Sequence, residues 1–407
     1  MRSLPSRALS RVLSPDSQIG LMNRSILFLL TAFLVWGSAQ AAVLPPPPDV
    51  AGSAWLLIDA DTGHVIAERN ADEPLPPASL TKLMTSYVLS AELAAGRVSN
   101  DDLVDVSENA WAQNPLFAGS SLMWIEPGKP VTLLELHRGV VISSGNDATV
   151  AIAEHVAGSE SAFAEMMNAH AQALGLTGTH FVNSHGLPDP EHYTTARDLA
   201  ALAVALINEF PEDYALYKER EYTYNDIRQY NRNTLLAKDP SVDGLKTGHT
   251  QEAGYCLVAS AMRNGMRLVS VVLGTTSERA REAETRKLLN YGFRTFETLA
   301  LYSPGDELAT TRLWMGVEDQ LSLGVAETIQ LTIPRGARDK LDAVMNIDEV
   351  IKAPVAAGDV HGELVVQLDG ETLYTLPLVA LRDAEESGFF ARLWDAITLF
   401  FIGLFGN

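Results

Sequence analysis

The chain has 407 residues, 47% of them hydrophobic, and its 51 acidic residues outnumber its 30 lysines and arginines to give a formal charge of −21. This apolar content excludes a disordered or fibrous protein, and the length predicts two or three domains. The excess of acidic residues argues against nucleic acid as a partner, because nucleic-acid binding needs a basic surface. The single cysteine excludes an internal disulfide and any metal or redox site that needs several cysteines.

The amino-terminal segment has the plan of a secretory signal peptide. Arg24 precedes an apolar run from Ile26 to Trp36, and Ala39-Gln40-Ala41 supplies small residues for cleavage. The run is shorter than a membrane span requires. We therefore predict a signal peptide over residues 1–41, with Met22 as a candidate translation start.

A linker and a first folded domain follow. Four consecutive prolines predict an extended linker over residues 42–50. Residues 51–301 begin with short apolar strands, continue with helical periodicity from about residue 79 to 220, and return to strands around the hairpin signal Asn264-Gly265. A long helix is expected over 277–299. This order predicts an α+β domain, with an antiparallel sheet built from both ends of the domain and a helical insert between them.

The carboxy-terminal part changes character. Residues 302–384 consist of short runs rich in Val, Thr and Leu, broken by Gly, Pro and Asp, which predict a small all-β domain. Residues 385–407 repeat aromatic and aliphatic side chains at helical spacing, with Arg392 and Asp395 between them. Such a pattern is usually a core helix, but the terminal position and the phenylalanines favour an amphipathic helix lying in a membrane surface. The two charges argue against a full span.

Three short motifs carry the candidate chemistry, and the first is Ser79-Leu80-Thr81-Lys82. Prolines 76 and 77 precede it and a helical pattern follows, so we expect Ser79 in the first helical turn. Positions i and i+3 share a helix face, which brings the Lys82 amine to the Ser79 hydroxyl. A lysine with a lowered pKa can take the proton of a serine nucleophile. Taken alone, this motif more often marks a solvated helix end.

The second motif, Ser144-Gly145-Asn146, lies in a predicted loop between two apolar helices. Such a loop can present Ser144 as a proton relay and the Asn146 amide as a partner for a substrate carbonyl. A helix N-cap is the alternative for Asn146, and Ser107-Glu108-Asn109 carries the same pattern.

The third motif, Lys246-Thr247-Gly248-His249, begins the returning strands. On an edge strand, Lys246 and Thr247 can bind a carboxylate, and Gly248 lets a substrate backbone approach closely. The amides of His249 and Ser79 can form an oxyanion hole. An ordinary surface strand is the alternative.

Together the motifs are specific, because penicillin-binding proteins and class A β-lactamases carry this trio in this order. Three further features are similar to one branch of these proteins: the Ser-Gly-Asn form of the second motif, the segment from Asp243 to Thr250, and Arg281-Glu282-Ala283-Glu284. Over nearly the whole mature chain, the sequence resembles the low-molecular-mass penicillin-binding proteins that are D-alanyl-D-alanine carboxypeptidases of the bacterial periplasm.

The resemblance implies a serine β-lactamase/transpeptidase-like domain that removes the terminal D-alanine from peptidoglycan stem peptides through an acyl-serine, without a metal or organic cofactor. It implies that Ser79 forms the acyl-enzyme, Lys82 accepts its proton and Ser144 assists proton transfer. The substrate-binding set would be Asn146, Lys246, Thr247, Gly248, His249, Arg232 and Arg281, with Lys246 on the terminal carboxylate. The resemblance further implies acylation by β-lactam antibiotics and a periplasmic location, at the outer face of the inner membrane through the C-terminal helix.

Other functions compete with this interpretation. A D,D-endopeptidase of the same fold is a close rival, while a class A β-lactamase would need a deacylating Glu where the chain has Asn183-Ser184-His185-Gly186-Leu187. His185, Asp189 and His192 could instead form a zinc site of a metal hydrolase, although they lie in a proline-bracketed loop without a His-Glu-x-x-His motif. A purely structural protein that binds the cell wall would not be acylated at all.

Overall fold

The computed structural model describes residues 44–405, so the predicted signal peptide lies outside the described residues. The described chain forms two compact units. The first contains residues 45–299 and 330–335, and the second contains residues 300–329 and those from 336 onward. We describe each unit by itself.

The first unit is built on a five-stranded antiparallel sheet with the order β2-β1-β9-β8-β7. The strands are β1 (Ala54–Asp59), β2 (Val65–Arg69), β7 (Val242–Thr250), β8 (Gly254–Arg263) and β9 (Met266–Thr275). Asn264 and Gly265 join β8 to β9 with φ angles of 52° and 82°, the positive values that a tight two-residue hairpin needs. The predicted α+β fold, with a sheet made from both ends of the domain, is confirmed.

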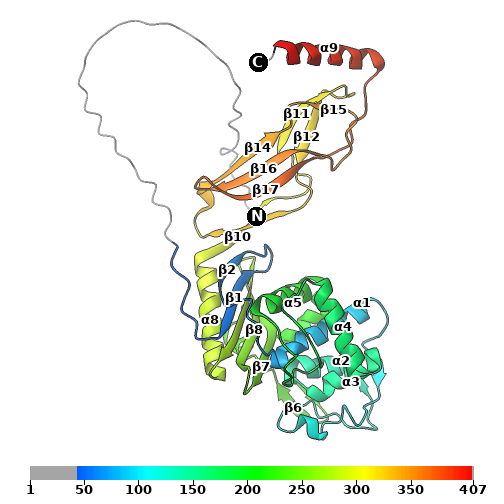
Figure 1. Cartoon of the computed structure of the whole chain (residues 1–407), viewed down its shortest axis with the longest axis vertical. Coiled ribbons are helices and arrows are strands. Elements are labelled where there is room, and N and C mark those ends of the chain that lie inside the picture. Colours follow the sequence, from blue (N-terminus) through cyan, green and yellow to red (C-terminus); the bar gives the residue numbers. More distant parts are fainter. Residues whose placement is uncertain (1–43, 406–407) are drawn as a thin grey trace, which may run out of the picture. The chain divides into compact units, whose positions relative to one another are not determined.

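Helices cover both faces of this sheet (Figure 1). The helices of the insert are α1 (Lys82–Ala94), α2 (Leu133–Arg138), α3 (Asn146–Ala157), α4 (Glu160–Ala173), α5 (Ala196–Glu209), α6 (Pro211–Tyr214) and α7 (Leu235–Lys238). The insert also contains two short antiparallel strand pairs. In the first, β3 (Leu103–Val104) pairs with β4 (Val131–Thr132), and in the second, β5 (Glu221–Tyr224) pairs with β6 (Ile227–Tyr230). Along β1, Leu56 packs with the insert, whereas Leu57 packs with the opposite layer. Successive residues of a strand face opposite sides, so a sheet covered on both faces needs this nearly continuous apolar sequence.

The opposite layer is α8 (Glu278–Thr295). This helix is shorter than the one expected over 277–299, because the chain extends at Phe296 into β10 (Phe296–Tyr302) and pairs with β13 (Ile329–Pro334). The predicted end of the helix is therefore wrong.

The second unit is dominated by a six-stranded sheet with the order β14-β16-β17-β12-β11-β15. Its strands are β11 (Ala309–Trp314), β12 (Gln320–Gly324), β14 (Leu341–Ile347), β15 (Ile351–Lys352), β16 (Val360–Leu368) and β17 (Glu371–Ala380). The C-terminal segment then forms α9 (Phe389–Phe405). The predicted all-β domain and C-terminal helix are both confirmed. Among the described residues, no helix combines the length and apolarity needed to cross a membrane.

Candidate active site

Ser79 and Lys82 lie where a short turn meets α1. Ser79 belongs to a 3-10 turn, Ala78–Thr81, and α1 begins at Lys82, so Ser79 precedes the α-helix instead of occupying its first turn. Lys82 is fully buried, and its Nζ donates to Ser79 Oγ (3.1 Å), Asn146 Oδ1 (2.7 Å) and the His185 carbonyl oxygen (2.6 Å). The spacing therefore brings the two side chains together as expected, but in a buried setting that excludes a solvated helix end.

Burial makes Lys82 a suitable base. It lowers the pKa of the Lys82 amine to about 7, with Arg232 also lowering it and the carboxylates of Asp147 and Glu160 opposing the shift. A lysine with this pKa is partly neutral near pH 7, and a neutral amine can accept a hydroxyl proton.

Ser144 follows a change in helix type. The residues after α2 wind as a π-helix, Gly139–Ser143, and Ser144 ends it in the left-handed conformation, with φ 64° and ψ 35°. This backbone presents Ser144 Oγ to Lys246 Nζ, which donates to it across 2.9 Å. A π-turn and a left-handed residue are both uncommon and often mark functional sites.

Asn146 does not cap a helix. Gly145 occupies the cap position of α3, whereas the Asn146 side chain accepts the hydrogen bond from Lys82. The N-cap alternative for Asn146 is therefore wrong. The competing Ser107-Glu108-Asn109 does not line the pocket that contains Ser79.

The third motif lies on β7, the edge strand of the sheet. Gly248 allows a close approach there. A Cβ at this position would lie 3.0 Å from the Pro77 carbonyl oxygen and 3.2 Å from Leu80 Cγ, so the turn carrying Ser79 packs directly on this strand. Lys246 is a buried residue of this strand, and burial first and then the charges of Lys82, Arg232 and Arg281 lower its pKa. His249 stacks on Tyr255 with ring centroids 3.9 Å apart.

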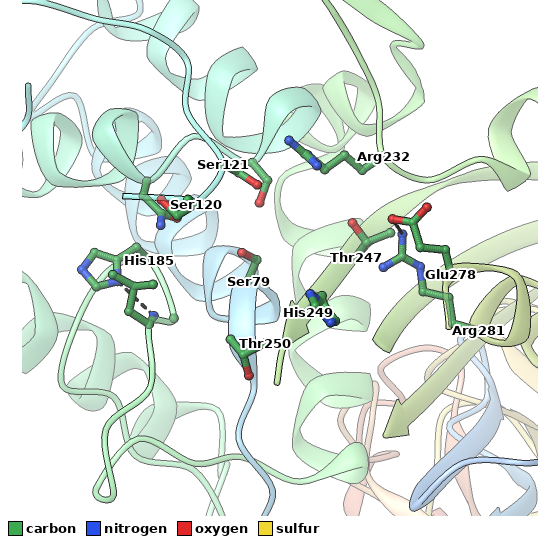
Figure 2. A pocket seen from close by; sticks show the side chains of 16 residues that line it. Ser79, Ser120, Ser121, His185, Arg232, Thr247, His249, Thr250, Glu278 and Arg281 are labelled. Atoms are coloured by element: carbon green, nitrogen blue, oxygen red, sulfur yellow. Dashed lines mark hydrogen bonds and ion pairs between the residues drawn. The ribbon is translucent and has the colours of Figure 1, made fainter. Parts of the chain in front are cut away.

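One pocket of about 210 Å³ collects most of the predicted residues. It is lined by Ser79, Ser144, Asn146, Arg232, Thr247, Gly248, His249 and Arg281. Figure 2 shows Ser79 near the middle, with His185 and Ser120 on one side and Thr247 and Arg281 on the other. Lys82 and Lys246 do not line it but reach the two serine hydroxyls from behind.

Two arginines give the pocket a positive end. Arg232 Nε donates to the Ser143 carbonyl oxygen (3.1 Å), so the π-turn fixes its guanidinium at the rim. Arg281, on α8, lies over the Tyr255 ring at 5.7 Å and 3.6 Å from the Glu278 carboxylate. These contacts hold two guanidinium groups where an anionic ligand end could reach them.

Sequence reasoning missed the loop that carries Ser120 and Ser121. Both serines line the pocket, and buried Asp147 fixes their loop by accepting from the backbone amides of Met123 (2.8 Å), Trp124 (2.7 Å) and Ile125 (3.2 Å). Asp147 directly follows the second motif, but an acidic residue in the first turn of a helix is too common to signal this role.

The candidate zinc ligands are engaged within the protein. His192 Nδ1 accepts from the Val182 amide (3.0 Å), so its Nε2 carries the proton and donates to Thr81 Oγ1 (2.7 Å). His185 Nδ1 likewise accepts from the Leu187 amide (3.1 Å). Within residues 44–405, no group of three His, Cys, Asp or Glu side chains could hold a metal ion. These findings do not support the zinc hypothesis.

Comparison with known proteins identifies the family of the chain. Residues 40–277 match the family described as D-alanyl-D-alanine carboxypeptidase, peptidase family S11. The chain belongs to this family. Residues 296–386 match the C-terminal domain of penicillin-binding protein 5, which agrees with the all-β unit.

Individual family members are similar along most of the chain. D-alanyl-D-alanine carboxypeptidase DacC of Escherichia coli is 46% identical over 384 residues, covering 94% of each chain. The crystal structure of penicillin-binding protein 5 from Haemophilus influenzae superposes with a TM-score of 0.80 and 41% identity, covering 84% of this chain and all of that one. Penicillin-binding protein D2 from Listeria monocytogenes, solved in an ampicillin-bound form, has a TM-score of 0.55 and 29% identity, covering 61% of this chain and all of that one.

Proposed function

We propose that this protein is a serine-type D-alanyl-D-alanine carboxypeptidase that removes the terminal D-alanine of peptidoglycan stem peptides. The observation that carries the proposal is the buried Lys82 amine, which has a pKa lowered to about 7 and lies 3.1 Å from Ser79 Oγ. Ser79 itself lines a pocket that has two arginines at one end. Family membership and the relatives' names support the same reaction.

Acylation begins with neutral Lys82. Its lone pair takes the Ser79 hydroxyl proton while Ser79 Oγ bonds to the penultimate carbonyl carbon. The backbone amides of Ser79 and His249 stabilise the negative oxygen of the tetrahedral intermediate. When the C–N bond breaks, the Ser144 hydroxyl passes the proton from Lys82 to the leaving D-alanine nitrogen, so an acyl-serine remains.

Hydrolysis reverses these roles. A water molecule attacks the ester carbonyl and gives its proton to Lys82, and Lys82 returns that proton to Ser79 Oγ when the ester bond breaks. A β-lactam follows the first step alone. Ser79 Oγ bonds to the lactam carbonyl carbon, the ring C–N bond breaks, and the leaving nitrogen takes the proton but stays attached to the penicilloyl group on Ser79. No metal or organic cofactor takes part in either step.

Substrate binding uses the rest of the pocket. The terminal carboxylate of the substrate contacts Thr247, Arg232 and Arg281. Lys246, which the sequence predicted to bind this carboxylate, does not line the pocket and donates to Ser144 Oγ instead. The Asn146 amide group and the backbone at Gly248 contact the peptide itself. A D,D-endopeptidase would need room for a longer chain beyond the same carboxylate end, where Arg232 and Arg281 lie.

A class A β-lactamase is less well supported. Among the residues that line the pocket, the carboxylate is Glu278, which neighbours Arg281 and not Ser79 in Figure 2. Glu278 is therefore badly placed to activate water against an acyl-Ser79.

We further propose that residues 1–41 direct export, that residues 51–301 form the catalytic domain, and that residues 385–407 attach the protein to the outer face of the inner membrane. Of the α9 side chains, Phe390 is 83% exposed and Trp394 is 71% exposed. An exposed aromatic helix face is typical of a helix that lies in the membrane interface. The β domain, residues 302–384, would lift the catalytic domain towards the wall.

The deciding experiment is mass spectrometry after brief exposure to benzylpenicillin. One penicilloyl group on a peptide containing Ser79, absent from Ser79→Ala, is the expected result. Release of D-alanine from a D-Ala-D-Ala peptide, unchanged by a chelator, then identifies the reaction and separates it from zinc hydrolysis. A folded protein that takes no penicilloyl group would contradict the proposal.

A further inference from the structure

A loop between α4 and α5 supplies one of the three partners of Lys82. Residues 183–187 pass so close to the turn carrying Ser79 that a Cβ on Gly186 would lie 1.8 Å from the Ala78 carbonyl oxygen. In this position the His185 carbonyl oxygen accepts from Lys82 Nζ at 2.6 Å. The loop therefore supplies one of the contacts that set the position of the Lys82 amine relative to the serine.

Glu160, the first residue of α4, holds that loop. Its Oε1 accepts from the Ser184 amide (3.0 Å) and the Ser184 hydroxyl (2.6 Å), and it lies 3.3 Å from His185 Nε2. Because His185 Nδ1 accepts from the Leu187 amide, Nε2 carries the ring proton and points it at Glu160. One carboxylate oxygen thus gathers three contacts from two adjacent residues.

The proton count at Lys82 shows why the loop position matters. A neutral amine has two hydrogens and one lone pair. Asn146 Oδ1 and the His185 carbonyl oxygen accept the two hydrogens, at 2.7 Å and 2.6 Å, so the lone pair is left facing Ser79 Oγ. If the His185 carbonyl moved away, the amine could rotate and turn a hydrogen, not the lone pair, to the serine.

We propose that Glu160 is a positioning residue, which fixes the 183–187 loop so that Lys82 presents its lone pair to Ser79. The inference rests on the proposed function, since it assigns a source for the orientation of the base. Glu160 contacts neither Ser79 nor Lys82 through a hydrogen bond and acts through Ser184 and His185.

The charge of Glu160 adds a second signature. The charged groups that act on Lys82 are Asp147 and Glu160, which raise its pKa, and Arg232, which lowers it, while Lys246 adds a further amine nearby. His185 contributes no charge near pH 7, because burial and Lys82 lower its pKa to about 3. Removing the Glu160 charge alone should therefore lower the pKa of Lys82 further.

Two substitutions separate position from charge. Glu160→Gln keeps an Oε1 acceptor but removes the charge, whereas Glu160→Ala removes both. Glu165→Ala is the matched control, because Glu165 is an exposed residue of the same helix. The rate of benzylpenicillin acylation is measured against pH for each variant, with thermal unfolding to check the fold.

For Glu160→Gln we expect a high-pH rate close to that of the unmodified protein and an acid limb moved to lower pH by at least about 0.3 unit. For Glu160→Ala we expect the high-pH rate to fall roughly ten- to a hundredfold, as for other small misplacements of a catalytic group. A Glu160→Ala rate within about twofold of Glu165→Ala, on a folded protein, would overturn the proposal.

A second readout does not depend on activity. The pKa of Lys82 is measured by NMR titration of the 13Cε resonances of labelled lysine, with the Lys82 signal assigned by its loss in Lys82→Met. A lower Lys82 pKa in Glu160→Gln supports the inference, and an unchanged pKa contradicts the role of Glu160. If the unmodified protein were not acylated at all, the proposed function would fail while this titration still tested Glu160.

Discussion

Lys246 donates a hydrogen bond to Ser144 Oγ across 2.9 Å, although Lys246 itself does not line the pocket. Its pKa is lowered by burial first and then by the charge of Lys82. The pocket therefore has two lysine–serine pairs, one beside the proposed nucleophile and one beside the proposed proton relay. In the proposed mechanism, Lys82 accepts the proton and Ser144 relays it to the leaving group.

The pH dependence of acylation should follow Lys82. Because the pKa of Lys82 is about 7 and only its neutral form accepts a proton, we expect the rate of penicilloylation to rise with pH through about 7 and then to level off. The rate constant is measured by mass spectrometry from about pH 5 to about pH 9. A rate that does not change across this range would exclude Lys82 as the base.

Ser144→Ala should slow turnover more than it weakens binding. Loss of the relay hydroxyl should lower kcat for D-alanine release roughly a hundredfold or more while KM changes little. Ser143→Ala is the matched control, because the Ser143 hydroxyl bonds to the Gly139 carbonyl oxygen inside the π-turn. Equal losses in both variants would indicate disruption of the turn instead of loss of a relay.

Arg281→Gln should affect only substrates with a free terminal carboxylate. A charge-assisted contact contributes about 1.5–3 kcal/mol, so kcat/KM should fall roughly ten- to a hundredfold for such a peptide. For a peptide that ends in a carboxamide, the same substitution should change kcat/KM little. Arg286→Gln, at an exposed position of α8, is the control, and a loss that is equal for both peptides would contradict the assignment.

Asp147→Asn should destabilise the protein. The Asp147 carboxylate accepts hydrogen bonds from the backbone amides of Met123, Trp124, Ile125 and Ala148. In asparagine one carboxylate oxygen is replaced by an NH2 group, which cannot accept, so some of these amides would lose their partner. We expect a loss of about 2–4 kcal/mol in the free energy of unfolding by urea. Asp105→Asn, at an exposed position, should change stability by less than about 0.5 kcal/mol.

The exposed aromatic side chains of α9 should control membrane attachment. Replacing Phe390 and Trp394 together by serine should weaken binding to lipid vesicles roughly a hundredfold or more, since each buried aromatic contributes about 2 kcal/mol. Val360→Ser, at an exposed apolar position of β16, is the control. Co-sedimentation with vesicles measures the effect, and equal binding by all three proteins would place the attachment elsewhere.

Several features of the fold and site could be predicted from sequence because their causes are local. Asn264-Gly265 satisfies a backbone requirement of its own hairpin, and the three-residue spacing of Ser79 and Lys82 brings them together on one turn. The motif residues were recognisable since the chemistry limits which side chains can occupy them.

Other features depend on contacts between distant segments, which local patterns do not show. The helix predicted to reach residue 299 ends at Thr295 because the next residues pair with β13, more than 25 positions further along. Lysine side chains are usually solvated, so the local sequence around Lys246 does not predict that this residue is buried. The left-handed backbone of Ser144 and the contacts of Glu160 likewise require partners from other elements.

The pairing of β1 with β9 has a consequence for the order of folding. Ala54 lies opposite Leu273, so the sheet joins residues more than 200 positions apart. The edge strand β7 and the turn carrying Ser79, which pack together at the pocket, likewise come from opposite sides of the helical insert. Contacts of such separation form slowly, because a long loop must close before they stabilise anything. The pocket can thus assemble only after nearly the whole first unit has been synthesised and joined. During refolding, acylation of Ser79 by benzylpenicillin should accordingly appear later than helix formation. The length of this delay would measure how slowly the sheet closes.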